Sequence, residues 1–300
     1  MESVTKTNIF GRLSGNRSQF LVYEMQFKSR EPNAMILPIP TAMNPNEESV
    51  RFFNLEDYPA FFADIARGFP SLVPPPIMSR GLANSAGRQL QVQKVGAFVA
   101  SVVPTVEDFN RLDPQFSIAP KTWAKLPNYN DYSFVVFQLD ELEGRPHPMA
   151  FEFQTRHTEE IFFPTVHIHD GEVHDEEDFD HQLYLQFPSW DEVVGQYTNM
   201  ADEATQWVRS QDVAQKTVKI EKAQGIVAAN QLLHRRTIVG QQRNEDTLAA
   251  VHKKTSNRPL SGRMLGQPAS WLGALMGVGA MAWLLNRRTQ LQNKSVSGRD

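Results

Sequence analysis

Residues 19–28 have the sequence QFLVYEMQFK, and their alternating pattern decides the predicted fold. In a β-strand every second side chain points to the same face, so Leu21, Tyr23, Met25 and Phe27 share one apolar face. The opposite face mixes apolar and polar side chains, which is typical of a strand with one buried and one wet face. This stretch therefore predicts a sheet in which antiparallel strands are connected by short turns.

The neighbouring sequence extends this pattern on both sides. A turn over residues 30–33 and an apolar stretch over 34–39 predict a hairpin with the first strand. We expect further strands at residues 95–103, 134–139, 149–154, 161–169 and 181–187. A helical spacing of apolar residues predicts one short helix over 55–65. Residues 19–190 should thus form a β-rich α+β domain of antiparallel hairpins with short helices, preceded by a flexible tail over residues 1–18.

The composition excludes several classes of protein. The chain has 300 residues, of which 41% are apolar and 10% aromatic, so it can bury a core and is not wholly disordered. It contains no cysteine, which excludes disulfides, thiol nucleophiles and cysteine-ligated metals.

Charge is distributed unevenly along the chain. Residues 1–208 hold 15 basic and 29 acidic side chains, whereas residues 209–300 hold 15 basic and 5 acidic ones. Good helix formers follow residue 190, so we expect a mainly helical basic segment over 191–255 and a linker over 256–267. Such a segment can lie on anionic lipid headgroups or remain a plain solvated helix. Nucleic acid is a less favoured partner, since residues 209–263 contain no aromatic side chain for stacking on bases.

Residues 264–286 form an uncharged stretch, MLGQPASWLGALMGVGAMAWLLN. A helix of that length reaches about 34 Å, enough for a hydrocarbon core of about 30 Å. We therefore expect a transmembrane helix over 268–286 and a basic polar tail over 287–300. A buried helix is the alternative, although its several glycines would weaken a helix in water. Because no secretory signal peptide is visible, the helix would be a single-pass tail anchor with the N-terminal domain in the cytoplasm.

Some residues of this stretch have expected roles at the membrane. Aromatic and basic side chains prefer the headgroup level. The expected interface residues are Trp271, Trp283, Arg287 and Arg288. Gly273 and Gly277 have the spacing that lets two membrane helices approach closely, which predicts weak self-association through this helix.

The most suggestive stretch for chemistry holds four of the eight histidines within fifteen residues. On a strand, His167 and His169 would point to the same face, and a turn over residues 170–171 can fold His174 back toward them. The expected metal ligands are His167, His169, His174, His181 and Asp170. Imidazoles combined with a carboxylate suit Zn, Fe, Mn or Ni rather than Ca or Mg.

Charge repulsion supports a metal in this loop. Seven carboxylates lie between residues 170 and 180, and no Lys or Arg occurs from residue 157 to residue 208. Uncompensated carboxylates at that density repel one another, and a bound cation would relieve the repulsion. The alternative is a solvated acidic loop whose histidines face water.

Taken together, these patterns favour a membrane-tethered, non-enzymatic protein with a cytosolic α+β domain and a structural transition metal in the acidic loop. One alternative is a metal-dependent hydrolase or oxygenase that uses His167, His169 and His174, with Glu172 or Asp175 as general base. Another is a soluble polyanion-binding protein. The expected partners are a lipid bilayer and its anionic headgroups.

Overall fold

The computed structural model describes residues 3–15, 17–30, 33–70, 93–96, 98–112, 120–139, 143–168, 172–194, 201–202 and 205–250. Residues 1–253 form one compact unit and residues 254–300 a second one. The predicted linker, transmembrane helix and basic tail over residues 256–300 lie outside the described residues.

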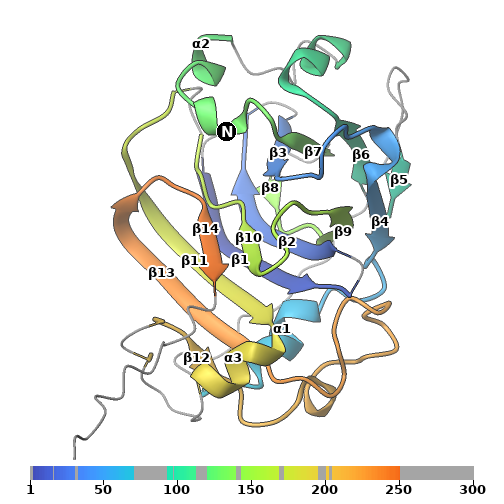
Figure 1. Cartoon of the computed structure of the whole chain (residues 1–300), viewed down its shortest axis with the longest axis vertical. Helices are drawn as coiled ribbons and strands as arrows, with labels where there is room; N and C mark the ends of the chain where they lie inside the picture. The colour runs from blue at the N-terminus through green and yellow to red at the C-terminus, as the bar shows by residue number, and fades with distance from the viewer. Residues whose placement is uncertain are drawn as a thin grey trace, which may run out of the picture. The chain divides into compact units, whose positions relative to one another are not determined.

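Strands predominate in the described part of the chain (Figure 1). The largest sheet has eight strands, and seven of them follow one another across it. Their spatial order is β12 (Val208–Arg209), β13 (His234–Arg243), β11 (Glu176–Gln186), β1 (Ser3–Leu13), β2 (Ser18–Lys28), β9 (Met149–Gln154) and β4 (Val50–Asn54). The eighth, β8 (Glu143–Gly144), pairs with one end of β2. β1 and β11 run parallel, and the other neighbours are antiparallel.

Both faces of this large sheet are buried. On β2, Leu21 and Tyr23 belong to one apolar cluster, whereas Phe20 and Val22 belong to another on the opposite face. The alternating sequence therefore predicted the strand correctly, but the expectation that its second face is wet is wrong. The second face is covered by protein instead of water, because Phe20 and Val22 provide enough apolar surface to hold a further layer.

A smaller antiparallel sheet covers the first face. Its strands, in spatial order, are β3 (Asn33–Ile39), β7 (Ser133–Leu139), β6 (Phe98–Val103) and β5 (Gln93–Val95). Val135 and Phe137 of β7 point into the same cluster as Leu21, while Phe134 and Val136 point outward. The outward side chains pack under a cap of short helices, which are η2 (Val106–Arg111), α2 (Pro120–Trp123) and η4 (Pro127–Tyr129). One more short helix, η1 (Glu47–Ser49), precedes β4.

The second face of the large sheet is covered by α1 (Phe61–Ala66) and by residues 210–233. A polar network joins these two segments. The Tyr58 hydroxyl donates to Asp64 Oδ2 (2.8 Å) and accepts from the Lys219 backbone N–H (2.9 Å). Arg67 pairs with Asp64 and donates to the Thr217 carbonyl. Because Asp64 is buried, this network satisfies a carboxylate that would otherwise be costly to bury.

The predicted helical basic segment over residues 191–255 is not formed. α3 (Pro188–Val193) ends near the start of that segment, η5 (Ala214–Lys216) is a single turn, and most of the described backbone after residue 233 is strand. Gln224 and Gly225 have φ values of 50° and 80°, which interrupt any helical turn. Burial of apolar side chains such as Val218 and Ile226 against α1 outweighs the local helix propensity.

The expected flexible tail over residues 1–18 is also corrected, because β1 lies in the middle of the large sheet. Ile9 and Phe10 are fully buried on opposite faces of that strand. Polar residues such as Lys6 and Asn8 give this stretch the character of a tail. Its strand forms because β11, far along the chain, supplies a parallel partner.

The predicted fold class, an α+β domain with a helical basic segment and an apolar helix, is therefore wrong. The described chain is mainly β-sheet. α1, η2 and α3 have six residues each, far fewer than the about 20 that cross a bilayer, and no other helix among the described residues is long and apolar enough to do so. No helix that could anchor the chain is thus found in the part that the structure describes, and to that extent the prediction of a membrane-tethered protein with a single-pass tail anchor, and the cytoplasmic placement that followed from it, is corrected. The expected interface and packing residues (Trp271, Trp283, Arg287, Arg288, Gly273 and Gly277) lie outside the described residues.

A two-stranded sheet completes the unit, with β10 (Glu160–Phe163) antiparallel to β14 (Thr247–Ala250). Gln19 of β2 attaches β10 to the large sheet through its side-chain amide. Its Nε2 donates to the Phe162 carbonyl (2.7 Å), and its Oε1 accepts from the Phe162 backbone N–H (3.0 Å). The amide thus replaces one residue of a neighbouring strand.

Candidate functional site

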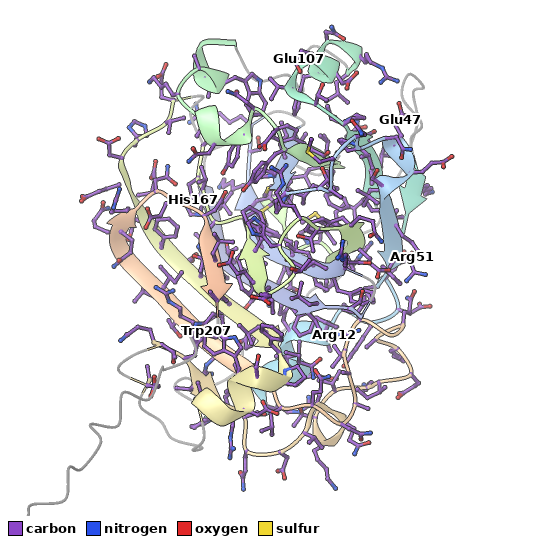
Figure 2. The ribbon with its side chains drawn as sticks, viewed as in Figure 1. Arg12, Glu47, Arg51, Glu107, His167 and Trp207 are labelled. Carbon is purple, nitrogen blue, oxygen red and sulfur yellow. The ribbon has the colours of Figure 1, made fainter. Side chains whose placement is uncertain are left out.

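Two of the four clustered histidines meet in the interior. His181 lies on β11, and the segment that follows β10 places His167 beside it; His167 is labelled in Figure 2. Their Nε2 atoms are 2.9 Å apart, so one ring donates a hydrogen bond and the other accepts it. Phe179 stacks on the His167 ring at 4.6 Å and meets the His181 ring edge-on. Both histidines are buried, which makes this pair a part of the core.

The predicted metal site is not assembled in the part of the chain that the structure describes. No group of three or more His, Asp or Glu side chains there could hold a metal ion. His174 is exposed, and His169 and Asp170 lie outside the described residues. The strand expected over 161–169 ends at Phe163, so the two-residue spacing of the histidines no longer places them on one sheet face.

Part of the acidic charge is compensated from elsewhere in the chain. Glu172, one of the two expected general bases, forms an ion pair with Lys125 at 2.6 Å. A lysine far away in the sequence therefore relieves part of the charge repulsion that was expected to require a bound metal ion. For the residues that the structure describes, the prediction of a structural metal in this loop is corrected on these grounds.

Two side chains of the basic stretch contact the rest of the described protein. The Arg235 guanidinium lies over the Phe69 ring at 4.8 Å, and Lys222 Nζ donates to the Asp57 carbonyl (3.2 Å). Arg12, also labelled in Figure 2, donates from Nε to the Ile226 carbonyl (2.6 Å). These contacts give no support to the expected binding of lipid headgroups.

The turn between β13 and β14 is held by the side chain of Asn244. Its Oδ1 accepts from the His167 backbone N–H (2.7 Å), and its Nδ2 donates to the His167 carbonyl (2.9 Å). The same Nδ2 also donates to the His174 carbonyl (3.1 Å). Asn244 thereby fixes the turn to the segments on both sides of the buried histidine pair.

Asp246 holds the other side of this turn. Its Oδ1 accepts from the backbone N–H groups of Thr165 (2.9 Å) and Val166 (3.1 Å), and its Oδ2 accepts from the Tyr129 hydroxyl (2.6 Å). Burial raises the pKa of Asp246 to about 6, although all three hydrogen bonds favour its ionised form. The hairpin of β13 and β14 is therefore rigidly attached at its turn.

Beyond its first residues, β13 has a strand partner on one side only. β11 pairs with all of β13, whereas β12 pairs only with His234 and Arg235. Among the described residues, no strand lies on the other side of residues 236–243. The end of the large sheet is therefore an open edge, which we call the β13 edge (residues 236–243).

Hydrogen bonds show which backbone groups face outward from this edge. The Leu233 carbonyl accepts from the Ser210 N–H, and the Val239 carbonyl accepts weakly from Gln242 Nε2 at 3.3 Å. Backbone groups alternate in direction along a strand, so Thr237 and Val239 point their N–H and C=O groups away from β11. Residues 239–243 are exposed, and the Val239 side chain is 59% exposed.

The predictions from sequence did not include this edge. Thr237, Ile238 and Val239 are three β-branched residues in succession, which favours a strand over a helix. Asn244 and Asp246 are typical turn residues and mark the end of that strand. These two signals could have identified the hairpin, but not the lack of a neighbour on one side.

Comparisons with known proteins find similarity in structure but not in sequence family. No family model matches the chain. The crystal structure of baculovirus P35 is 14% identical, with a TM-score of 0.42 over 84% of this chain and 97% of that one. A mutated baculovirus P35 after caspase cleavage is 14% identical, with a TM-score of 0.44 over 83% of this chain and 100% of that one. The caspase-8/P35 complex gives 13% identity, with a TM-score of 0.41 over 83% and 97% of the two chains.

Proposed function

We propose that this chain binds another protein by accepting one of its strands at the β13 edge. The observation that carries the proposal is the row of outward backbone groups on Thr237 and Val239, which have no strand partner among the described residues. An extended peptide can add itself to such an edge, where main-chain hydrogen bonds provide affinity and side chains provide specificity.

The surroundings of the edge suit a docked strand. β11 and the turn residue Asn244 hold β13 in place, so little order has to be gained on binding. The exposed Val239 offers an apolar contact in the middle of the edge. Each main-chain hydrogen bond contributes about 0.5–1.5 kcal/mol net, so a short strand alone would bind with modest affinity.

The substitution Thr237→Pro tests the proposal. Proline removes the outward N–H of residue 237 without removing a hydrogen bond to β11, which is the arrangement that edge strands tolerate. Thr237→Val is the matched control, because both variants lose the hydrogen bond from Thr237 Oγ1 to Gln182 but only the proline loses the N–H. We expect both variants to unfold at similar temperatures.

The probes are ten-residue peptides in which valine alternates with lysine, glutamate or serine, and binding is measured by fluorescence anisotropy. At least one peptide should bind the wild type and Thr237→Val, and Thr237→Pro should weaken it at least about tenfold by loss of one hydrogen bond and a steric clash. Protection of the Val239 amide from hydrogen exchange on binding provides a second readout in the unmodified chain. Binding that Thr237→Pro leaves unchanged, or the absence of binding by every peptide, would overturn the proposal.

A caspase, the partner in the caspase-8/P35 complex, is a separate protein probe in the same assay. Binding that is lost in Thr237→Pro and kept in Thr237→Val would support docking at the edge. Binding that is equal in both variants would place the caspase contact elsewhere on the chain.

A further inference from the structure

Three carboxylates lie in a row on one face of β11, because Glu176, Asp178 and Asp180 are two residues apart on a strand. In the register with β13, Glu176 lies opposite Arg243, but Asp178 and Asp180 have no basic residue opposite them. Neither aspartate forms an ion pair with another described residue, but Asp180 Oδ2 accepts a hydrogen bond from the Lys6 backbone N–H of β1 (2.5 Å), on the side of β11 away from β13. The sheet next to the β13 edge therefore has negative charge that no described residue neutralises through an ion pair.

The side chains of β13 that share this face are neutral at the centre of the edge. Asp178 lies opposite Gln241, and Asp180 lies opposite Val239. Val239 is largely exposed, so the surface between the aspartates and the open edge combines apolar and polar character without positive charge.

A strand that docks on β13 would lie about 10 Å from β11, since adjacent strands are about 4.8 Å apart. Its side chains opposite Val239 and Gln241 would project from the same face as the two aspartates. Lysine and arginine are long enough to approach Asp178 across that distance, and their aliphatic stems can cover an apolar side chain such as Val239. Asp180, whose carboxylate is hydrogen-bonded to β1, attracts them from farther away. Acidic side chains at the same positions would be repelled.

We infer that the partner of the β13 edge is an extended protein segment with Lys or Arg at alternate positions, on the same face of the sheet as Asp178 and Asp180. The inference rests on the proposed strand docking and adds the chemistry of the docked strand. A second copy of this chain is a poorer occupant, because its own acidic row would approach this one and like charges oppose edge-to-edge pairing.

The alternating valine peptides test this charge preference with the full chain. We expect the lysine peptide to bind about 10- to 100-fold more tightly than the glutamate peptide at low salt, and the difference to shrink at 0.5 M NaCl. The double substitution Asp178→Asn, Asp180→Asn keeps the shape of both side chains and should weaken the lysine peptide about 3- to 10-fold.

Glu107→Gln is the matched control, since Glu107 is exposed and lies well away from β13 in Figure 2. It should leave binding unchanged. If the glutamate or serine peptide binds as tightly as the lysine peptide, and Thr237→Pro abolishes that binding, the edge binds strands but the charge preference is wrong. If the lysine peptide binds Thr237→Pro as tightly as the wild type, the attraction is a general charge effect, and strand docking itself is overturned.

Discussion

At the scale of single residues, burial shifts the pKa values of an acidic and a basic side chain in opposite directions. It raises the pKa of Asp246 to about 6 and, together with Arg209, lowers the pKa of His234 to about 3. The folded state therefore favours the neutral form of both groups. For Asp246 the stability that comes from protonation is lost as the pH rises from about 4 to 6, whereas for His234 stability is lost as the pH falls from about 6.5 toward 3.

The substitution Asp246→Asn should stabilise the protein at pH 7. The amide keeps an oxygen for the N–H groups of Thr165 and Val166 and can donate to the Tyr129 hydroxyl, while the cost of a buried charge disappears. We expect a gain of at most about 3 kcal/mol in the free energy of unfolding at pH 7 and no gain at pH 4. Urea denaturation at both pH values measures it, with the exposed Glu159→Gln as control. Destabilisation at pH 7 would show that the ionised carboxylate is needed.

At the scale of elements, amide side chains take the place of missing strand neighbours. Gln19 pairs with Phe162 of β10, and Asn244 pairs with His167 just beyond it. Gln186 accepts from the Ala228 backbone N–H (2.8 Å) and donates to its carbonyl (2.9 Å), which holds part of the 210–233 segment. Irregular segments can therefore lie inside the unit because these side chains satisfy their backbone groups.

The substitution Gln19→Leu should destabilise the protein strongly. Leucine is similar in size, but it leaves the buried N–H and C=O of Phe162 without their partners. The expected loss in the free energy of unfolding is about 2–5 kcal/mol, measured by urea denaturation. Gln26→Leu on the same strand, where the residue is partly exposed, is the control and should change stability by less than about 0.5 kcal/mol. A loss below about 1 kcal/mol for Gln19→Leu would mean that water replaces the amide.

At the scale of the whole molecule, segments from both ends of residues 1–253 build one sheet. β1 pairs with β11 on one side, and β13 pairs with β11 on the other. The sheet is therefore complete only when residues beyond 233 are present. Ala249 of β14 belongs to the same apolar cluster as Ile9 of β1. Folding therefore depends on contacts between residues far apart in sequence. Such contacts form slowly.

Truncation tests this dependence. A chain that ends after Lys253 should unfold cooperatively, because residues 1–253 form one compact unit. A chain that ends after Leu233 lacks β13 and β14, exposes one side of β11 and should show no cooperative transition. Near-ultraviolet circular dichroism during heating measures both, with the full chain as reference. A cooperative transition in the shorter chain would contradict the role given to the β13–β14 hairpin.

Prediction from sequence succeeded where the pattern is local. The alternation over residues 19–28 predicted β2, and apolar stretches predicted the strands that became β3, β7 and β9. Prediction failed for β1, because its polar residues Thr5 and Lys6 lie at an exposed end of the strand and its parallel partner β11 is far along the chain. It failed again for residues 210–233, where burial against α1 replaced the expected helix with turns.

The candidate site was less accessible to sequence reasoning than the strands. The spacing of the histidines placed His167 and His181 among the expected ligands. Only the fold decided that these two meet and that His174 lies at the surface. The β13 edge has no sequence signature of its own, because an open edge is defined by the absence of a neighbour in space.

The amino-acid sequence by itself determined the absence of cysteine chemistry, the split between an acidic body and a basic C-terminal part, and the two faces of β2. These properties depend on composition or on residues within one strand. The tertiary structure alone decided which strands are neighbours, which carboxylates are compensated and where the sheet ends. Those outcomes depend on contacts between residues far apart in the chain, and side-chain periodicity contains no information about such contacts.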